Sequence, residues 1–359
     1  MTVPPLSSTF DFSLPSELEA AEPPEARGLG RDQVRLMVSN YSTDQVRHTH
    51  FHNLANYMNE GDVLVINTSR TRNAALLATR SDGLVLELHL SVHLAENSWT
   101  LEARSIDDAG KTQHWEAAKP GETLSLPGGA SATLLGPYVS DCGDRPSPST
   151  TVWKARLTLP ISDEEYLAKY GFPIRYNYVK DKWPLSYYQT VYATETGSAE
   201  MPSAGRPFTS KILRRLTFRG VRIGSLILHT GISNIESHEP PYKEYYRVPE
   251  ETAQLVNQAR ASGKRVVAVG TTVVRALESV NNGDGAIHAG EGWTCLVLSP
   301  QQRPQTVNAL LTGMHEPKAS HLAILEALSG SSHMKVAYAA ALQTGYLWHE
   351  FGDMHLILP

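Results

Sequence analysis

Side chains that bind anions or move protons gather at four junctions between predicted elements of this sequence. Three junctions follow short apolar runs, and the fourth precedes a helical pattern at 319–329. Because the carboxyl ends of parallel strands meet at one edge of a sheet, where such folds bind ligands, we expect these side chains to share one site. They are Asn67 and Arg70; His229 and Gly231; Gly270, Thr271, Thr272 and Arg275; and His315 and Lys318.

The stretch VVAVGTTVVRALES, which ends at Ser279, predicts a buried strand that passes directly into a helix. It has neither the G-x-G-x-x-G of a dinucleotide loop nor the G-x-x-x-x-G-K-[ST] of a phosphate loop. The free N–H groups and the dipole of a helix start favour an anion, so Thr271–Thr272, with Arg275 one turn further, suits a carboxylate. Two plainer interpretations stay open: a threonine that only caps the helix, and an Arg275–Glu278 surface pair.

Three titratable residues of this group, His229, His315 and Lys318, are the candidates for acid–base catalysis. The alternative for His229 is a buried histidine whose hydrogen bonds are satisfied. A nucleophilic enzyme is poorly supported, because the chain lacks a G-x-S-x-G elbow and neither cysteine lies in a basic turn.

The triplet His48, His50 and His52 raises the possibility of a metal site, because on a strand the three side chains would share one face. A helical pattern over 51–59 breaks that face, and no aspartate or glutamate completes a ligand set. We therefore expect no metal.

One basic cluster stands in the stretch SKILRRLTFRGVR, at 210–222. Lys211, Arg214 and Arg215 fall on one helical face, Arg219 follows, and no acid interrupts them. A solvated surface explains such a face; contacts with a phosphate backbone are the functional interpretation.

Composition limits the class of protein. The chain has 359 residues, of which 41% are hydrophobic and 19% charged, enough for a large core or two domains. A net charge of −5 gives no support for a wholly basic nucleic-acid coat. Cys142 and Cys295 are far apart, which fits a reducing cytoplasm and argues against a disulfide scaffold. With no long apolar run, we expect a soluble, cytoplasmic protein without membrane contact, and a monomer.

The elements predict an α/β fold with an insertion. Residues 76–158 read as short alternating strands separated by turn residues, typical of a small all-β, barrel-like domain. Strands and helices alternate elsewhere, which predicts a mostly parallel sheet in a catalytic domain of residues 1–75 and 159–359. Within it we expect an amphipathic helix at 51–62 and a strand at 293–298.

The motifs together resemble one family. FDFSLPSELEA, GDVLVINTSR, MPSAGRPFT, GVRIGSLILHTG, KEYYRV, GTTVVRALES and FGDMHLIL occur here in the order found in the S-adenosylmethionine:tRNA ribosyltransferase-isomerase family of queuosine biosynthesis. The resemblance runs almost end to end and implies an α/β domain with an inserted β-barrel.

The resemblance also implies a reaction. Members of that family transfer the ribosyl part of S-adenosylmethionine to a 7-aminomethyl-7-deazaguanine base in a tRNA anticodon stem-loop, and release adenine and methionine. The sugar becomes an epoxycyclopentane ring, and no metal or further cofactor takes part. The resemblance places Ser203, Ala204 and Gly205 among the residues that bind S-adenosylmethionine, beside those named above.

Several motif positions depart from the family pattern. Arg206-Pro207 replaces a leucine–histidine pair, and Tyr242 and Glu316 also differ. These changes keep two alternatives open: a diverged paralogue that uses S-adenosylmethionine on a small-molecule acceptor, and a non-catalytic protein that only binds it.

Overall fold

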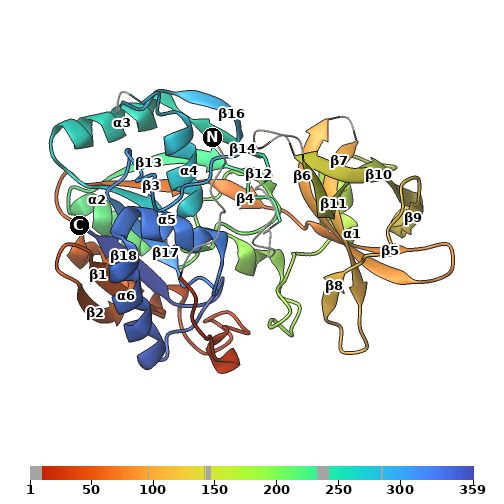
Figure 1. The fold of residues 1–359 in the computed structure, drawn as a ribbon, viewed down its shortest axis with the longest axis horizontal. Helices are drawn as coiled ribbons and strands as arrows, with labels where there is room; N and C mark the ends of the chain where they lie inside the picture. The colour runs from red at the N-terminus through yellow and green to blue at the C-terminus, as the bar shows by residue number, and fades with distance from the viewer. Residues whose placement is uncertain (1–9, 96, 141, 143–146, 233–241, 284–285) are drawn as a thin grey trace.

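The computed structural model describes residues 10–95, 97–140, 142, 147–232, 242–283 and 286–359. Figure 1 shows two bodies side by side: a larger one of strands and helices, and a smaller one built mainly of strands. The α/β class expected from the sequence is confirmed. Within the described part, no helix is long and apolar enough to cross a membrane.

Nine strands of the described chain form the sheet of the larger body. Their spatial order is β16 (Gly290–Thr294), β14 (Glu244–Val248), β13 (Arg222–Leu228), β3 (Val63–Asn67), β15 (Val266–Val269), β17 (Ala309–Gly313), β18 (Met354–Leu358), β1 (Arg35–Asn40) and β2 (Gln45–His50). The central strands β13, β3, β15 and β17 run parallel, as the alternation of strands and helices predicts.

The expectation of a mostly parallel sheet is wrong toward both edges. β14 and β16 pair antiparallel on one side, and so do β17 with β18 and β1 with β2 on the other. The reason lies in the connections, because β2 follows β1 through a short turn. β18 is reached through two consecutive helices, α5 (Ser320–Ser329) and α6 (Ser331–Gln343), which return the chain in the opposite direction.

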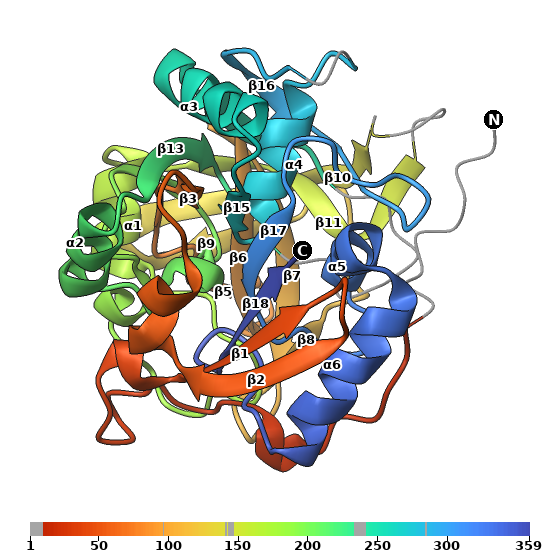
Figure 2. The ribbon, with the colours of Figure 1, turned by 90° about the vertical axis from the view of Figure 1, so that its left-hand side faces the viewer.

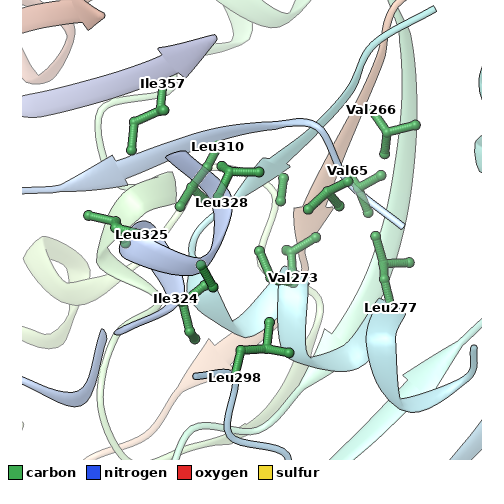
Figure 3. Packing of buried hydrophobic residues seen from close by; sticks show 14 of the residues in the cluster. Val65, Val266, Val273, Leu277, Leu298, Leu310, Ile324, Leu325, Leu328 and Ile357 are labelled. Carbon is green, nitrogen blue, oxygen red and sulfur yellow. The ribbon is translucent and has the colours of Figure 1, made fainter. Parts of the chain in front are cut away.

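Alternate residues of the central strands feed two hydrophobic clusters. Val65 and Val266 point to the face covered by α3 (Glu250–Ala261), α4 (Thr271–Ser279), α5 and α6, where Figure 3 shows them beside Val273. Leu64 and Val267 point to the other face, against α2 (Ser210–Phe218) and the 3₁₀ helix η3 (Phe51–Tyr57). Both faces are covered, which explains why these strands read as continuous apolar runs. Figure 2 shows the helices on either side of the sheet.

The smaller body is a sheet that closes on itself. In the described chain its order is β11 (Ser147–Thr158), β10 (Ala130–Ser140), β9 (Thr123–Leu126), β5 (Ala75–Thr79), β6 (Val85–Ala95), β7 (Ser98–Ile106) and β8 (Thr112–His114), and β11 also pairs with β7. Its interior holds apolar side chains, and α1 (Asp163–Tyr170) adds Tyr166 and Leu167 to them. The division into two domains stays a prediction, with which this closed sheet agrees.

Short elements complete the described fold. β4 (Ser69–Thr71) and β12 (Glu195–Ser198) pair parallel between the two bodies. The remaining 3₁₀ helices are η1 (Ser16–Leu18), η2 (Arg31–Gln33), η4 (Pro127–Gly129), η5 (Leu185–Tyr188) and η6 (Ser203–Gly205).

Two sequence expectations need correction at their ends. The helix expected at 51–62 is the 3₁₀ helix η3, which ends where Met58 becomes extended; its buried residues Phe51, Leu54 and Ala55 suit either helix type. The strand expected at 293–298 ends at Thr294. Cys295 and Leu296 lie outside the sheet. Cys295 is disulfide-bonded to Cys142, and the Leu296 carbonyl accepts a hydrogen bond from Arg275.

The two cysteines form a disulfide between the bodies, against the expectation drawn from their number and spacing. Cys142 follows β10 of the closed sheet and Cys295 follows β16 of the large sheet, with their Cα atoms 5.4 Å apart. Their separation of 153 residues along the chain is bridged because the closed sheet folds back against the edge of the large one.

Candidate functional site

A cavity of about 420 Å³ opens beyond the carboxyl ends of β13, β15 and β17. The residues that follow these strands line it, as expected for an open α/β sheet. Of the residues predicted from the sequence, the cavity collects Ser203, Ala204, Gly231, Gly270, Thr271, Thr272, Arg275, His315 and Lys318.

The turn from β15 into α4 forms one wall. Gly270 is the N-cap, with a φ of 90° that favours glycine, and a Cβ there would stand 3.4 Å from the Cβ of Ala204. Neither threonine is the N-cap: Thr271 is hydrogen-bonded through Oγ1 to Nδ1 of His321 at 2.9 Å. Gly270, Thr271 and Thr272 line the cavity, so the start of α4 lies at its wall, where an anion can bind.

Arg275 stands on the same wall and is ion-paired with Glu244. Its Nε donates to the carbonyl of Leu296 at 2.9 Å, while its Nη2 is buried without a hydrogen-bond partner in the described chain. The surface pair with Glu278 does not form, because the Glu278 carboxylate accepts hydrogen bonds from Thr306 instead. One guanidinium N–H group thus stays available for an acceptor in the cavity.

Two histidines lie face to face at the rim. The rings of His315 and His321 stack with centroids 4.9 Å apart, and Nε2 of His315 is hydrogen-bonded to Thr312 at 2.7 Å. Burial, and then the neighbouring His321, hold the pKa of His315 well below its usual value. Burial lowers the pKa of His321 to about 4. Both rings are therefore neutral at pH 7.

Another part of the cavity lining is acidic and aromatic. Tyr176 donates to Glu200 at 3.0 Å and packs its ring 4.2 Å from that of His349. Nε2 of His349 lies 2.9 Å from Glu316, and this hydrogen bond is the main cause that lowers the Glu316 pKa. A lining with these groups suits a flat, polar heterocycle.

Glu350 is the unusual acid of this part of the lining. Its side chain lines the cavity, the residue is only 8% exposed, and its Oε1 is buried without a hydrogen-bond partner in the described chain. Burial, reinforced by the nearby Glu200, raises the Glu350 pKa well above its usual value. A carboxyl group whose pKa is raised in this way is suited to donate a proton to a bound ligand.

Other predicted site residues lie apart from this cavity. Asn67 is buried beneath it, where its side chain joins β3 to the N–H and carbonyl of Leu228. Arg70 is exposed on β4. Gly205 lies behind the lining, with Tyr192 so close that a Cβ would collide with its hydroxyl. Lys318 does reach the rim, but its side chain is 65% exposed and ion-paired with Asp11 at 3.3 Å.

His229 lines a second, smaller cavity next to the first. Its Nδ1 is hydrogen-bonded to Ser69 at 2.7 Å and its Nε2 lies 3.8 Å from Glu195. Burial, followed by the charge of Arg72, lowers its pKa to about 4. One ring nitrogen of His229 is thus hydrogen-bonded, so the plainer interpretation holds in part, and the side chain also faces a cavity.

The basic cluster lies on α2, and Lys211, Arg214, Arg215 and Arg219 are all exposed. Arg215 donates to Asn56 at 2.9 Å and to the carbonyl of His52. Figures 1 and 2 place α2 at the end of the larger body that faces away from the closed sheet.

The histidine triplet does not form a cluster. His48 is bonded to Tyr346 at 3.0 Å, whereas His50 and His52 stack on each other. Among the described residues, no group of three or more histidine, cysteine or acidic side chains is arranged to hold a metal ion.

Comparisons with known proteins give the family. Residues 7–357 match the model of a family described as queuosine biosynthesis protein. This chain belongs to that family. S-adenosylmethionine:tRNA ribosyltransferase-isomerases are among its relatives: the one from Moorella thermoacetica is 36% identical over 97% of this chain and 98% of its own length, and the one from Symbiobacterium thermophilum is 37% identical over 98% and 99%.

A solved member of the queuosine family has the same fold. The crystal structure of S-adenosylmethionine tRNA ribosyltransferase from Thermotoga maritima matches with a TM-score of 0.54 and 28% identity, over 98% of this chain and 100% of that one.

The departures from the queuosine family pattern fall in different places. Arg206 is buried outside the cavity lining, where it donates to Glu25 at 2.7 Å and lies over the ring of Phe351. Tyr242 does line the cavity, but its hydroxyl is bonded to Ser149 of the closed sheet at 2.9 Å. Glu316 is the partner of His349. Two of the three changes thus make contacts within the cavity wall, and the third is structural.

Sequence reasoning missed Glu244, His321, His349 and Glu350. His321 carried a usable signal, since it stands in the first turn of a helix that begins at the predicted rim. Glu244 begins a strand and Glu350 lies in an irregular segment between α6 and β18. An isolated acid in such places has no periodic pattern that could reveal it.

Proposed function

We propose that this chain is an S-adenosylmethionine:tRNA ribosyltransferase-isomerase. In this reaction the ribosyl carbons of S-adenosylmethionine pass to the aminomethyl group of a 7-deazaguanine base in a tRNA anticodon stem-loop. Adenine and methionine leave, and the sugar becomes an epoxycyclopentane. The observation that carries the proposal is the orphaned Nη2 of Arg275 beside the start of α4, in a chain whose relatives bear this name over nearly their full length.

The methionine carboxylate of the donor would lie at that wall. An anion there would accept the free N–H of Arg275 and the N–H groups at the start of α4. The adenosyl part would then extend toward Tyr176 and Glu350 in the acidic and aromatic part of the lining. In this orientation the methionine carboxylate would lie against the N–H donors of Arg275 and α4, and the adenine ring against Tyr176 and Glu350.

Proton transfer would use the shifted groups of the two cavities. The sulfonium acidifies the protons on the adjacent C5′ carbon, so a neutral histidine is a sufficient base, and His315 and His229 are both neutral at pH 7. Adenine leaves more easily once a ring nitrogen is protonated, and Glu350, whose pKa burial raises well above its usual value, would supply that proton. Lys318, exposed and paired, would act on the substrate only by moving from Asp11.

The finer features of the proposal follow the family resemblance. Asn67, Arg70 and Gly205 would shape the donor site from behind its lining. The RNA backbone would meet the exposed side chains of α2, and the closed sheet at 76–158 would be an inserted domain. The enzyme would work as a monomer, with no metal. The Cys142–Cys295 bond removes the argument for a reducing cytoplasm that rested on unpaired cysteines, so the cytoplasm is proposed from the tRNA substrate alone.

The test is adenine release, measured by chromatography. The protein is incubated with S-adenosylmethionine and an anticodon stem-loop that carries 7-aminomethyl-7-deazaguanine, and separately with the same stem-loop carrying guanine. We expect adenine only with the modified RNA, and much less of it after Arg275→Ala at S-adenosylmethionine concentrations near the wild-type dissociation constant. Equal adenine release without the modified base would contradict the proposed acceptor.

A further inference from the structure

The second cavity, of about 300 Å³, lies where the two bodies meet. Ser91, Val92 and His93 of the closed sheet form one side, and the large sheet contributes the other through β13, β14 and β16. Thr230 lines this cavity and the donor cavity alike. Two ligands bound in the two cavities would therefore be separated by little more than one residue.

The walls of the second cavity suit a flat ring. The ring of Tyr245 lies 5.6 Å from that of His229 and nearly parallel to it, and Trp293 meets Tyr245 edge-on at 5.8 Å. Trp293 is 46% exposed, an unusual position for so large an apolar side chain. Exposed aromatic faces of this kind are what proteins use to hold an unstacked nucleobase.

The polar groups of this cavity suit a particular kind of ring. The guanidinium of Arg72 stands over the ring of Trp99 at 5.1 Å, and its Nε is buried without a hydrogen-bond partner in the described chain. Such a donor needs an acceptor such as the carbonyl oxygen of a guanine-like base. Next to the lining residue Thr196, one Glu195 carboxylate oxygen lies 3.8 Å from Nε2 of His229, while the other is ion-paired with Arg247. The first oxygen can meet a cationic amine.

The cavity is held in shape by close packing. Gly197 leaves room for the imidazole of His229, because a Cβ at that position would stand 2.2 Å from its ring. The Gly197 carbonyl in turn accepts a hydrogen bond from Arg72. One glycine thus positions both polar groups that face a ligand.

We propose that this interdomain cavity is the subsite for the acceptor base. It would take a 7-deazaguanine swung out of a single-stranded RNA loop, stacked on Tyr245 and Trp293, with its aminomethyl group toward His229 and Glu195. The inference rests on the proposed function and deepens it, since it separates an acceptor subsite from the donor cavity. Bases in a loop can reach such a pocket because little stacking or pairing has to be broken.

The experiment measures binding rather than turnover. Dissociation constants are determined for two anticodon stem-loops that differ only in carrying 7-aminomethyl-7-deazaguanine or guanine, with the wild-type protein, Trp293→Ala and Trp293→Phe. We expect the wild type to prefer the modified stem-loop. Trp293→Ala should weaken that binding by about 5-fold to 100-fold, the range for loss of one base stack, and Trp293→Phe should restore most of it.

Controls separate this inference from the proposed function. The dissociation constant of S-adenosylmethionine should stay unchanged in both Trp293 variants. Val336→Ala, which shortens an apolar side chain 41% exposed on α6 and outside both cavity linings, should keep the preference for the modified base. If the wild type does not prefer the modified stem-loop, or if Trp293→Ala keeps that preference in full, this cavity is not the acceptor subsite. Failure to release adenine despite a Trp293-dependent preference would instead count against the proposed reaction alone.

Discussion

Glu244 ties Arg275 to Gly231 across the wall of the donor cavity. One carboxylate oxygen accepts the Gly231 N–H at 2.8 Å and the other is paired with the guanidinium, from a position 31 residues earlier in the chain. The carboxylate therefore holds Arg275 in place and leaves its Nη2 for a ligand.

Replacing Arg275 by alanine should weaken binding of S-adenosylmethionine. A hydrogen bond to a charged group contributes roughly 1.5–3 kcal/mol, so the dissociation constant should rise by about one to two orders of magnitude. Isothermal titration calorimetry measures this directly. Arg219→Ala, at the exposed C-cap of α2, is the matched control and should bind S-adenosylmethionine as the wild type does. Unchanged affinity for S-adenosylmethionine in Arg275→Ala would show that the methionine carboxylate does not bind at that wall.

Glu350→Gln should slow the reaction with little change in affinity for S-adenosylmethionine. A general acid contributes about 10²- to 10⁴-fold, so kcat should fall within that range. In the wild type the protonated form is the active one. Because burial raises the Glu350 pKa, activity should fall as the pH rises through that value, and this limb should be missing in Glu350→Gln.

Glu316→Gln serves as the control variant for the pH–activity profile of Glu350→Gln. The Glu316 pKa is lowered by its bond to His349, so this group is ionised at neutral pH and cannot act as the acid. We expect the alkaline limb to persist in Glu316→Gln. A Glu350→Gln enzyme with an unaltered pH profile would show that the proton comes from another group.

Stability should decline as the solution becomes acidic. Burial lowers the pKa of His321 to about 4 and that of His355 to about 3, whereas an unfolded histidine titrates near 6.5. Below about pH 6.5 these histidines bind protons in the unfolded chain but stay neutral in the native state. The free energy of unfolding should therefore fall from about pH 6.5 downward. Urea unfolding at several pH values measures the slope. His321→Gln should flatten it; an equally steep decline in this variant would mean that other groups cause it.

The disulfide should contribute strongly to stability. For a loop closed over 153 residues, the loss of freedom in the unfolded chain gives an upper value of about 5 kcal/mol. Reduction with dithiothreitol should lower the denaturant midpoint by a corresponding amount. The Cys142→Ser and Cys295→Ser single variants should match the reduced protein and should not respond to dithiothreitol. Identical midpoints for oxidised and reduced protein would mean that the bond does not constrain the fold.

Local patterns in the sequence predicted the parts of the fold that local physics determines. The apolar run before Gly270 and the helical spacing after it specify a buried strand and a helix, and both are present. The shared rim of β13, β15 and β17 followed because parallel strands end on the same side. The antiparallel placement of β18 depends on how two helices return the chain, which no local pattern records.

The candidate site was predictable where residues follow a strand and not where the chain arrives from elsewhere. Arg275 and Thr271 were found because they stand next to VVAVG. Glu244 and Glu350 reach the cavity only through tertiary packing. The bond between Cys142 and Cys295 was missed for the same reason, since spacing alone does not bring two distant segments together.

The same bond makes a covalent ring of everything between Cys142 and Cys295. That ring contains Gly197, His229 and Tyr245 of the second cavity, and Ser203, Gly231 and Arg275 of the first. A protease that cuts the chain once inside the ring cannot release a fragment while the bond is intact. The nicked protein would keep its mass until a reductant is added. Part of the lining of each cavity thus belongs to a segment whose ends are fastened to each other as well as to the rest of the chain.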